Sequence, residues 1–299
     1  NCDIHHNNQG IYISANNNSI IDYNTIRDNS PQGGGRINAI FSYNTVKNNT
    51  VDGNNCYDCG GGIRFGGGVF DHNIISGNSG GDGAFVIYSS SGEVTNNIIF
   101  NNDTDDYAID QDNDGVPTFT RNIVIGRTNF PDVDLDESSS YTNNIFVGGL
   151  IGQIEFERNS TPDFSKNTIL NGPTNGQRLL LYANGNDVNQ PVYFSKNLFS
   201  GNPSGYYVEI GSVWGWSNTN LTYTQNNMIN NDGFYVKGPT NDHSVENNYW
   251  GTTTESEIQE MVYDWNDDAS LGFLDYDPYL TAPSTLAPVS PPKNVVKQS

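Results

Sequence analysis

The chain has 299 residues, of which 34% are hydrophobic and 12% aromatic, and its formal net charge is -21. This aromatic content excludes a disordered chain, and 34 acidic against 13 basic residues exclude the Lys/Arg clusters that bind nucleic acid or anionic membranes. No stretch approaches the roughly 18 apolar residues of a membrane-spanning helix, so we expect no membrane insertion.

One short motif recurs from the N-terminus onward: Asn, a spacer, an aliphatic residue, two spacers and often a second Asn. Its first three copies are NTIRDN, NTVKNN and NIISGN. Between the copies lie runs such as GIYIS, AFVIY and YYVEI, whose alternation is typical of half-buried strands. With an average step of about 25 residues, we assign the first Asn of the copies to Asn24, Asn44, Asn73, Asn97, Asn122, Asn144, Asn167, Asn197, Asn226 and Asn247.

The repeat predicts an all-β fold. Short strands joined by Gly, Asn, Asp and Ser turns, with no helical pattern inside the unit, favour a parallel β-helix over α-solenoids, leucine-rich repeats or propellers. We expect about ten coils, stacked at the roughly 4.8 Å spacing of paired strands. The Asn would take the left-handed conformation of a tight corner, its amide would bond from coil to coil, and the aliphatic residue two places on would point inward.

These units also resemble a known group. The alternation of NTIRDN-like and GIYIS-like segments is similar to the right-handed parallel β-helix repeats of the pectate-lyase-like superfamily, which includes NosD-like secreted proteins. Residues 246–280 resemble the terminal cap of many such bacterial proteins, and the whole resemblance covers residues 1–281. It implies a right-handed coil. It implies no single activity, because the superfamily includes lyases, hydrolases, epimerases, adhesins and binding proteins.

The cysteines are Cys2, Cys56 and Cys59. Cys56 and Cys59 lie in the Gly-rich segment CYDCGGG, where a local disulfide, two free thiols or half of a zinc site are the alternatives. No second Cys pair is present to complete a zinc site. A disulfide and the acidic composition both favour a secreted or cell-surface protein.

Acidic residues gather in the middle of the chain. The segment DQDNDG, with Asp110, Asp112, Asp114 and a Gly, resembles the start of an EF-hand-type calcium loop. The twelfth position of that loop, normally a bidentate Glu, is Arg121, so Asp134 from the next coil would have to supply further oxygens. We expect Ca²⁺ as the one cofactor, and a solvated acidic turn is the alternative.

The same acids supply a possible catalytic pair. Neighbouring coils place two carboxyl groups about 5 Å apart and alternate coils about 10 Å, near the separations of retaining and inverting glycosidases. The catalytic candidates are therefore Asp134 with Glu155, or Asp110 with Glu155. A lyase would instead need a base, for which Arg64 and His72, or Lys237 with Tyr235, are candidates.

Aromatic residues mark a second region. GSVWGWSN places Trp214 and Trp216 on the same side of an extended stretch, where they could stack on sugar rings; burial over the core is the alternative. Aligning the alternating runs puts further polar and aromatic residues on one outward stripe. The substrate-binding candidates are Trp214, Trp216, Tyr182, Glu209, Tyr235 and Arg64.

The pattern changes after residue 247. In TESEIQEMVYDW the apolar residues have helical spacing, and Thr254 with Glu257 predicts a capping box. We expect residues 247–281 to form a helical cap over the last coil of a 1–281 domain. Residues 282–299 are rich in Pro and Ser and predict a linker to a following domain.

The sequence therefore predicts a protein that binds polysaccharide along the long face of a β-helix. It would be a monomer within a longer secreted chain. A glycoside hydrolase or polysaccharide lyase on the same scaffold is the alternative from another class. A structural or adhesive surface protein without catalysis is the third.

Overall fold

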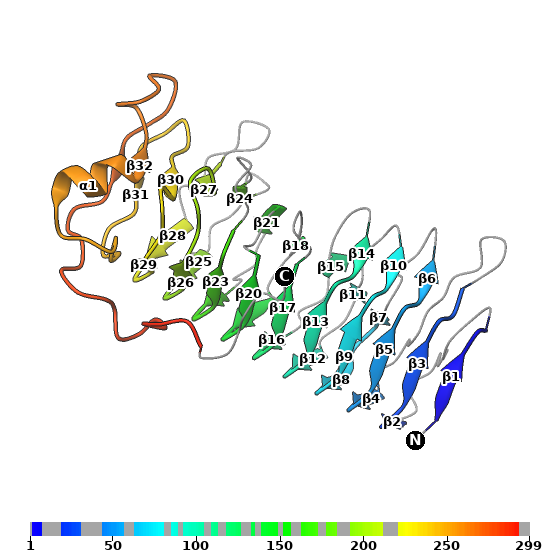
Figure 1. The fold of residues 1–299 in the computed structure, drawn as a ribbon. Coiled ribbons are helices and arrows are strands. Elements are labelled where there is room, and N and C mark those ends of the chain that lie inside the picture. The colour runs from blue at the N-terminus through cyan, green and yellow to red at the C-terminus, as the bar shows by residue number, and fades with distance from the viewer. Residues whose placement is uncertain are drawn as a thin grey trace. The chain divides into compact units, whose positions relative to one another are not determined.

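The structure is a computed structural model of the chain, and it forms two compact units, Asn1–Ser140 and Tyr141–Ser299 (Figure 1). It describes residues 2–7, 19–30, 44–56, 63–80, 85–88, 92–104, 109–112, 118–126, 133–134, 139–148, 152–156, 163–172, 178–183, 192–211 and 221–292. We call the sheets of the first unit 1A to 1D and those of the second unit 2A to 2C.

The first unit is built from four parallel sheets. Sheet 1A holds β1 (Asp3–His5), β3 (Thr25–Arg27), β5 (Thr50–Asp52), β9 (Ile74–Ser76), β13 (Ile98–Phe100) and β17 (Ile123–Ile125). Sheet 1B holds β2 (Ile20–Asp22), β4 (Asn44–Lys47), β8 (Gly68–Asp71), β12 (Gly92–Thr95) and β16 (Thr118–Thr120). Sheet 1C holds β6 (Asn55–Cys56), β10 (Ser79–Gly80) and β14 (Asp103–Thr104), and sheet 1D holds β7 (Ile63–Phe65), β11 (Phe85–Tyr88), β15 (Ile109–Asp112) and β18 (Val133–Asp134).

The second unit repeats this plan with three sheets and a terminal strand pair. Sheet 2A holds β20 (Ile145–Val147), β23 (Thr168–Leu170), β26 (Leu198–Ser200) and β29 (Asn227–Ile229). Sheet 2B holds β19 (Ser140–Thr142), β22 (Asp163–Ser165), β25 (Val192–Ser195) and β28 (Leu221–Thr224). Sheet 2C holds β21 (Gly152–Phe156), β24 (Arg178–Ala183), β27 (Tyr207–Ile210), β30 (Tyr235–Lys237) and β32 (Val262–Tyr263), and β31 (His243–Ser244) pairs with β33 (Leu274–Asp275).

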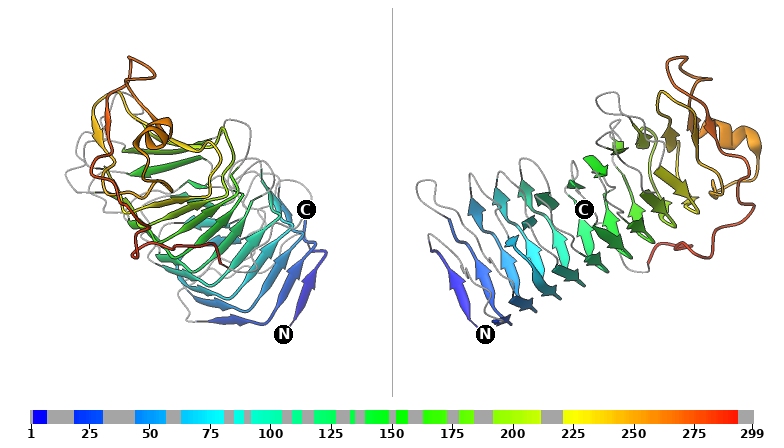
Figure 2. Two further views of the ribbon diagram at one scale, coloured as in Figure 1. Left: turned by 60° about the vertical axis from the view of Figure 1, so that its left-hand side comes forward. Right: turned by 180° about the vertical axis from the view of Figure 1, so that it is seen from behind.

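Each strand pairs in parallel with the equivalent strand of the neighbouring coil. Thr50 is the partner of Ile74, for example, and Ile74 of Ile98. Figure 2 shows the strands of each unit stacked in this way. The predicted parallel β-helix is therefore confirmed as a parallel β-solenoid with almost no helix.

The buried ladder of Asn residues is also confirmed. The Asn73 Oδ1 accepts from the main-chain N–H of Asn49 at 2.9 Å and from its Nδ2 at 3.0 Å. The Nδ2 of Asn73 in turn donates to the Val46 carbonyl at 3.0 Å. Because the ladder satisfies both amide groups and a main-chain N–H in every coil, it stabilises turns that are buried from water. Its members are Asn24, Asn49, Asn73, Asn97 and Asn122 in the first unit, and Asn144, Asn167, Asn197, Asn226 and Asn248 in the second.

Two details of the predicted repeat were wrong. Asn44 lies inside β4, and the ladder position of that coil is Asn49; Asn248 likewise replaces Asn247. The left-handed conformation belongs to the residue before the ladder Asn, as at His72 with φ 53° and Lys166 with φ 58°. That residue forms the corner, while the Asn itself is buried with its amide directed along the stack.

The aliphatic residue two places after each ladder Asn does point inward. Ile26, Val51, Ile75 and Ile99 are completely or almost completely buried in sheet 1A. In the second unit aromatic rings fill much of the core. The centroid of the Phe194 ring lies 4.9 Å from that of Phe164 and 5.4 Å from that of Tyr223, with nearly parallel planes.

The C-terminal segment differs from the expected cap. Helix α1 (Glu255–Glu260) begins after Thr254, as predicted, but the Thr254 side chain makes no capping hydrogen bond; instead the Thr252 hydroxyl bonds to Glu257. The helix has six residues because the chain then extends to form β32, which pairs with β30. Trp265, which helical spacing placed on the apolar face, is exposed.

Residues 281–292, which we call the C-terminal strap, are docked on sheet 2A. Asn227 Nδ2 donates to the carbonyls of Ser284 at 3.1 Å and Pro288 at 3.0 Å, and Asn227 Oδ1 accepts from the Ser284 N–H at 2.8 Å. The Pro/Ser-rich segment thus contacts the β-solenoid through the main chain of Ser284 and Pro288. A domain beyond it stays a prediction.

Candidate binding face

The outer side of sheet 2C carries the candidate binding face. In β27 the side chains of Val208 and Ile210 are buried, whereas Tyr207 and Glu209 are half-buried. β30 repeats this alternation, with Val236 buried between the half-buried Tyr235 and Lys237. The period of two places Tyr207, Glu209, Tyr235 and Lys237 on the side of the sheet that faces away from the core.

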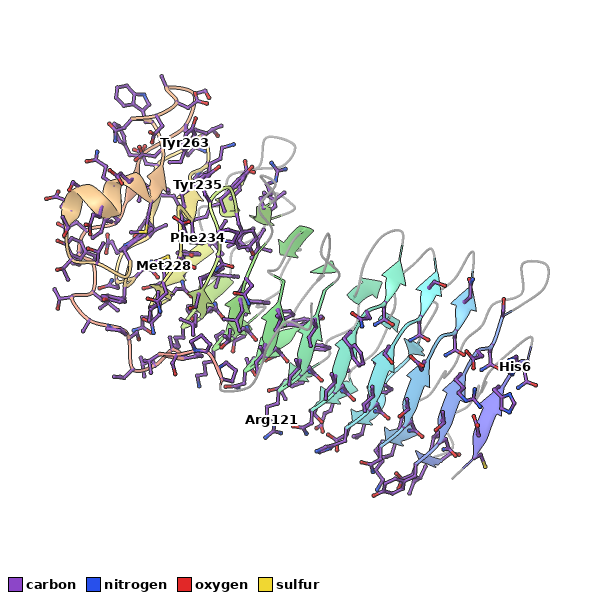
Figure 3. The ribbon with its side chains drawn as sticks, in the orientation of Figure 1. His6, Arg121, Met228, Phe234, Tyr235 and Tyr263 are labelled. Atoms are coloured by element: carbon purple, nitrogen blue, oxygen red, sulfur yellow. The ribbon has the colours of Figure 1, made fainter. Side chains whose placement is uncertain are left out.

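Three tyrosines form a ladder on this side. Tyr207 and Tyr235 are paired residues of adjacent strands, and their rings stack with centroids 4.7 Å apart and an interplanar angle of 8°. Tyr263 of β32 is the partner of Lys237 and lies diagonally to Tyr235, with ring centroids 5.9 Å apart and an interplanar angle of 46° (Figure 3). Because stacked rings cover one another's faces, the ladder presents ring edges and hydroxyl groups rather than open faces.

The surroundings of Tyr235 favour the protonated form of its hydroxyl. Burial, and then the neighbouring Tyr207, Tyr263 and Glu209, raise the pKa of Tyr235 above its ordinary value. A phenol with a raised pKa remains a hydrogen-bond donor throughout the physiological pH range.

A charged row runs beside the tyrosines. Lys237 Nζ donates to Glu209 Oε1 at 3.0 Å. Arg178 Nη1 lies 2.6 Å from Glu209 Oε2, close enough for an ion pair, although the angles do not satisfy a hydrogen bond. One carboxylate and two cations sum to a formal charge of +1 here, in a chain whose total is -21. The Arg178 side chain, 46% exposed, keeps donors that a ligand could reach.

Two of the predicted substrate-binding residues, Glu209 and Tyr235, share this face. Their predicted register was wrong by two residues, since Glu209 pairs with Lys237 and Tyr235 with Tyr207. A shift of two keeps a residue on the same side of a strand. Tyr182 is paired with Glu155 in the same sheet, and the side chains of both lie outside the described residues.

The acidic candidates of the first unit lie in sheet 1D. Arg64 pairs with Val86, Val86 with Asp110, and Asp110 with Asp134; the sequence leaves Ile109 and Asp110 as alternatives for this position. Asp112 ends β15, and the side chains of all these strands lie outside the described residues. Asp114, Trp214 and Trp216 also lie outside them. Glu155 belongs to sheet 2C, a different sheet from that of Asp110 and Asp134.

Some members of the face were missed by sequence reasoning. Arg178 and Tyr263 were not singled out. Tyr207 was included in the run YYVEI, but it was not assigned to the outward side of the sheet. The dipeptide Tyr-Val occurs at residues 207–208 and again at 235–236, and aligning these copies would have revealed the tyrosine ladder.

The described ranges have neither a metal-binding cluster nor a membrane-spanning helix. They contain no group of three or more His, Cys, Asp or Glu arranged to hold a metal ion. No helix within them has the length and apolar run needed to cross a membrane.

The fold and this face were compared with known proteins. No family model matches the chain, and neither a curated protein nor a solved structure is significantly similar to it. What the chain shows by itself is a parallel β-solenoid with buried Asn ladders.

Proposed function

We propose that the second unit binds polysaccharide along the outer face of sheet 2C. The observation that carries this proposal is the tyrosine ladder of Tyr207, Tyr235 and Tyr263 beside the Arg178–Glu209–Lys237 row. Sugar hydroxyls both donate and accept hydrogen bonds, and the face offers phenol donors, a carboxylate acceptor and two cationic donors.

The ladder geometry favours hydrogen bonding over ring stacking as the source of affinity. The faces of Tyr207 and Tyr235 cover each other, so a sugar ring could stack only at an end of the row. One coil is about 4.8 Å high, so a linear polymer lying along the row would meet a new hydroxyl at each coil. Trp214 and Trp216 would add the stacking faces that the ladder lacks.

Tyr-to-Phe substitutions test this mechanism. The double variant Tyr207→Phe/Tyr235→Phe keeps the two stacked rings but removes their hydroxyl groups. Each hydroxyl contributes about 1 kcal/mol to binding through its hydrogen bond. We expect the dissociation constant for the bound polysaccharide to rise roughly 10- to 30-fold in affinity electrophoresis and calorimetry, over a panel of neutral and uronate polymers. Tyr193→Phe, at an exposed tyrosine of sheet 2B, is the matched control and should bind normally. Unchanged binding in the double variant would show that the Tyr207 and Tyr235 hydroxyls do not bind the polysaccharide.

Catalysis is the second candidate function. Its support is the direct pairing of Asp110 with Asp134, which brings two acidic positions to adjacent coils. Ca²⁺ would be held by Asp110, Asp112, Asp114 and Asp134, with oxygen ligands of the kind that this cation prefers. Released reducing ends would indicate a hydrolase, and absorbance at about 235 nm, typical of unsaturated uronate products, would indicate a lyase. A melt with Ca²⁺ and with EDTA tests the cation separately.

We also propose the finer assignments that the sequence suggested. The chain would be a right-handed, pectate-lyase-like β-helix of about ten coils, closed by residues 247–281, and exported to the cell surface or the medium. The pairing of β32 with β30 supports the closing role of that segment. A structural or adhesive surface protein is the remaining alternative, and it predicts that no panel member binds sheet 2C.

A further inference from the structure

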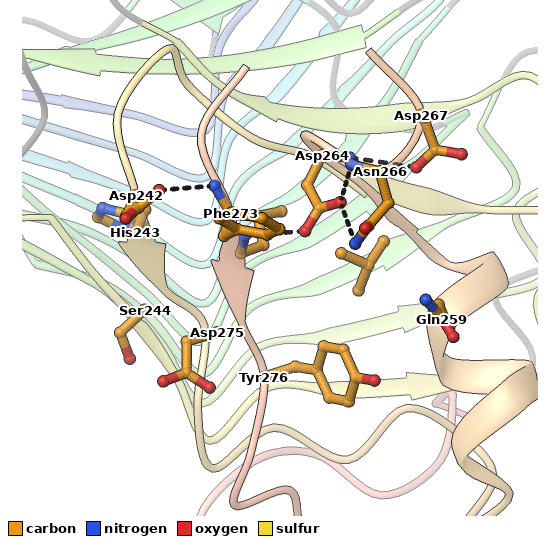
Figure 4. A pocket seen from close by; sticks show the side chains of 12 residues that line it. Asp242, His243, Ser244, Gln259, Asp264, Asn266, Asp267, Phe273, Asp275 and Tyr276 are labelled. Atoms are coloured by element: carbon orange, nitrogen blue, oxygen red, sulfur yellow. Dashed lines mark hydrogen bonds between the residues drawn. The ribbon is translucent and has the colours of Figure 1, made fainter. Parts of the chain in front are cut away.

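A pocket of about 620 Å³ opens in the C-terminal part of the second unit, beside the β31–β33 pair and helix α1 (Figure 4). A neighbouring hollow of about 450 Å³ shares Asp242, His243 and Ser244 with it. Neither belongs to the outer face of sheet 2C that we assign to polysaccharide. We call the larger hollow the C-terminal pocket.

Aromatic rings form one side of this pocket. Phe273 lines it and is 46% exposed, and the ring of Trp265, 47% exposed, lies against that of Phe273 with centroids 5.0 Å apart. Tyr276 is the second aromatic residue of the lining, whereas Trp265 lies behind Phe273 and does not line the pocket itself. Large aromatic side chains that are exposed together beside a hollow are typical of binding sites, because their burial by a ligand is favourable.

Four carboxylates line the pocket, those of Asp242, Asp264, Asp267 and Asp275, and Asp267 Oδ2 accepts from the Asp264 N–H at 3.3 Å. Asp264 is buried and fully used, since its oxygens accept from the N–H groups of Asn266 at 3.0 Å and Leu274 at 3.0 Å. Asp242 and Asp275 each use one oxygen, for the N–H of Phe273 at 2.8 Å and of Asp277 at 3.2 Å. Among the described residues, the other oxygen of each has no partner. Asp242 and Asp275 can therefore accept from a ligand without losing structural bonds.

The remaining polar lining consists of His243, Ser244, Gln259 and Asn266, whose side chains each carry both a donor and an acceptor and no formal positive charge. Burial lowers the pKa of His243, against an opposing hydrogen bond with the Leu221 backbone, so the imidazole is neutral at pH 7. Its Nε2 is buried and has no hydrogen-bond partner among the described residues. No Lys or Arg occurs among the described residues that line the pocket. A ligand that fits would bring hydrogen-bond donors and positive charge.

We propose that the C-terminal pocket binds an organic ammonium group, with Asp242 and Asp275 as its acceptors and the Phe273–Trp265 wall as its aromatic surface. Ammonium groups donate up to three hydrogen bonds and are attracted to the faces of aromatic rings. A neutral sugar would leave the negative charge uncompensated. A metal ion would need three closely spaced ligands, and the described lining does not provide such a group.

Matched pairs of probes test the charge requirement. The full chain is titrated with n-butylammonium against n-butanol, and with glucosamine against glucose, at about 0.15 M NaCl to screen diffuse attraction by the acidic surface. The Trp265 indole N–H in an NMR spectrum reports on the pocket. We expect saturable shifts for at least one amine and none for its neutral partner. Binding of glucosamine alone would identify a sugar-borne amine, and binding of both a general alkylammonium site.

Paired variants localise the binding. Asp242→Asn/Asp275→Asn keeps a carbonyl oxygen for the Phe273 and Asp277 N–H groups, so the fold should persist, and we expect at least about tenfold weaker amine binding. Asp163→Asn/Asp232→Asn removes two acids of the same unit outside the lining and should leave binding unchanged. Phe273→Leu should weaken binding about two- to fivefold.

Three results would overturn the proposal. The first is an equal shift of the Trp265 signal with an amine and with its neutral partner. The second is an equal loss of amine affinity in the pocket double variant and in the control double variant. The third is the absence of a saturable shift with either amine. If the pocket double variant fails to fold, the amine affinity of the Phe273→Leu variant becomes the test of the proposal. An affinity unchanged by that substitution would exclude the aromatic wall. Because the probes are small amines, this outcome is independent of polysaccharide binding at sheet 2C.

Discussion

The outer rows of sheets 1A and 2A show how the two units differ. In the first unit Ile74 and Ile98 occupy this row and are 38% and 36% exposed. In the second unit the corresponding positions in β23, β26 and β29 are Thr168, Leu198 and Asn227, all buried. Asn227 binds the C-terminal strap directly. The repeat therefore determines which residues point inward, whereas the outward position at Asn227 is covered by a segment far along the chain.

The cores differ in a related way. Sheet 1A buries mainly β-branched aliphatic residues, such as Ile26 and Val51, whereas Phe194 of the second unit stacks between Phe164 and Tyr223. Stacked aromatic pairs add about 0.5–1.5 kcal/mol beyond the effect of buried area. The second unit should thus lose more stability than the first when one core side chain is removed.

Replacement of a core ring should have the largest effect. We expect Phe194→Ala to lower the free energy of unfolding by about 3–5 kcal/mol, because it leaves a cavity between two stacked rings. Val94→Ala in sheet 1B, which removes two methyl groups, should cost about 2 kcal/mol. Urea denaturation measures both, and hydrogen exchange shows which unit opens. Equal losses would show that the aromatic stack adds nothing.

Release of the strap should have an intermediate effect. Asn227→Leu removes three hydrogen bonds and leaves main-chain groups of Ser284 and Pro288 without their partner, so we expect a loss of about 2 kcal/mol. Proteolysis within residues 281–292 should accelerate at the same time. Asn230→Gly is the control, because Asn230 is exposed and has a positive φ angle that Gly adopts readily. It should leave the rate of cleavage unchanged. Unchanged cleavage of the Asn227→Leu variant would mean that other contacts hold the strap.

The smallest effect is expected at the exposed row. Thr keeps the β-branched shape of Ile, so Ile74→Thr/Ile98→Thr should change the free energy of unfolding by less than about 0.5 kcal/mol per site. Thermal melts measure this difference. A loss above about 2 kcal/mol in total would show that the row is covered in solution and that the contrast with sheet 2A does not hold.

The sequence predicted the repeat well because both of its determinants are local. A buried amide, recurring every 22 to 30 residues and followed two places on by an apolar residue, defines each coil without further context. Asn44 was misassigned because several Asn residues occur close together, and only pairing across coils distinguishes Asn49. The strap was missed because Pro and Ser indicate an extended segment but not what it contacts.

The candidate site was predicted less completely. Glu209 and Tyr235 were found because strand alternation identifies outward residues, but their alignment across coils depends on loop lengths that differ from coil to coil. Arg178 was missed since its contact with Glu209 joins different columns of the sheet. The C-terminal pocket depends on hydrogen bonds between segments far apart in the sequence, such as that from the Phe273 N–H to Asp242, which no periodic pattern encodes.

The left-handed corner before each ladder Asn has a practical consequence. Its occupants are chemically diverse, including His72, Arg121, Lys166 and Gln225, although all share positive φ angles. The backbone thus fixes the corner while leaving the identity of the side chain open. Within each unit these corners form a regularly spaced series of tolerant attachment points. They could be used to arrange chosen functional groups in a line, one per coil, without disturbing the hydrogen-bonded interior.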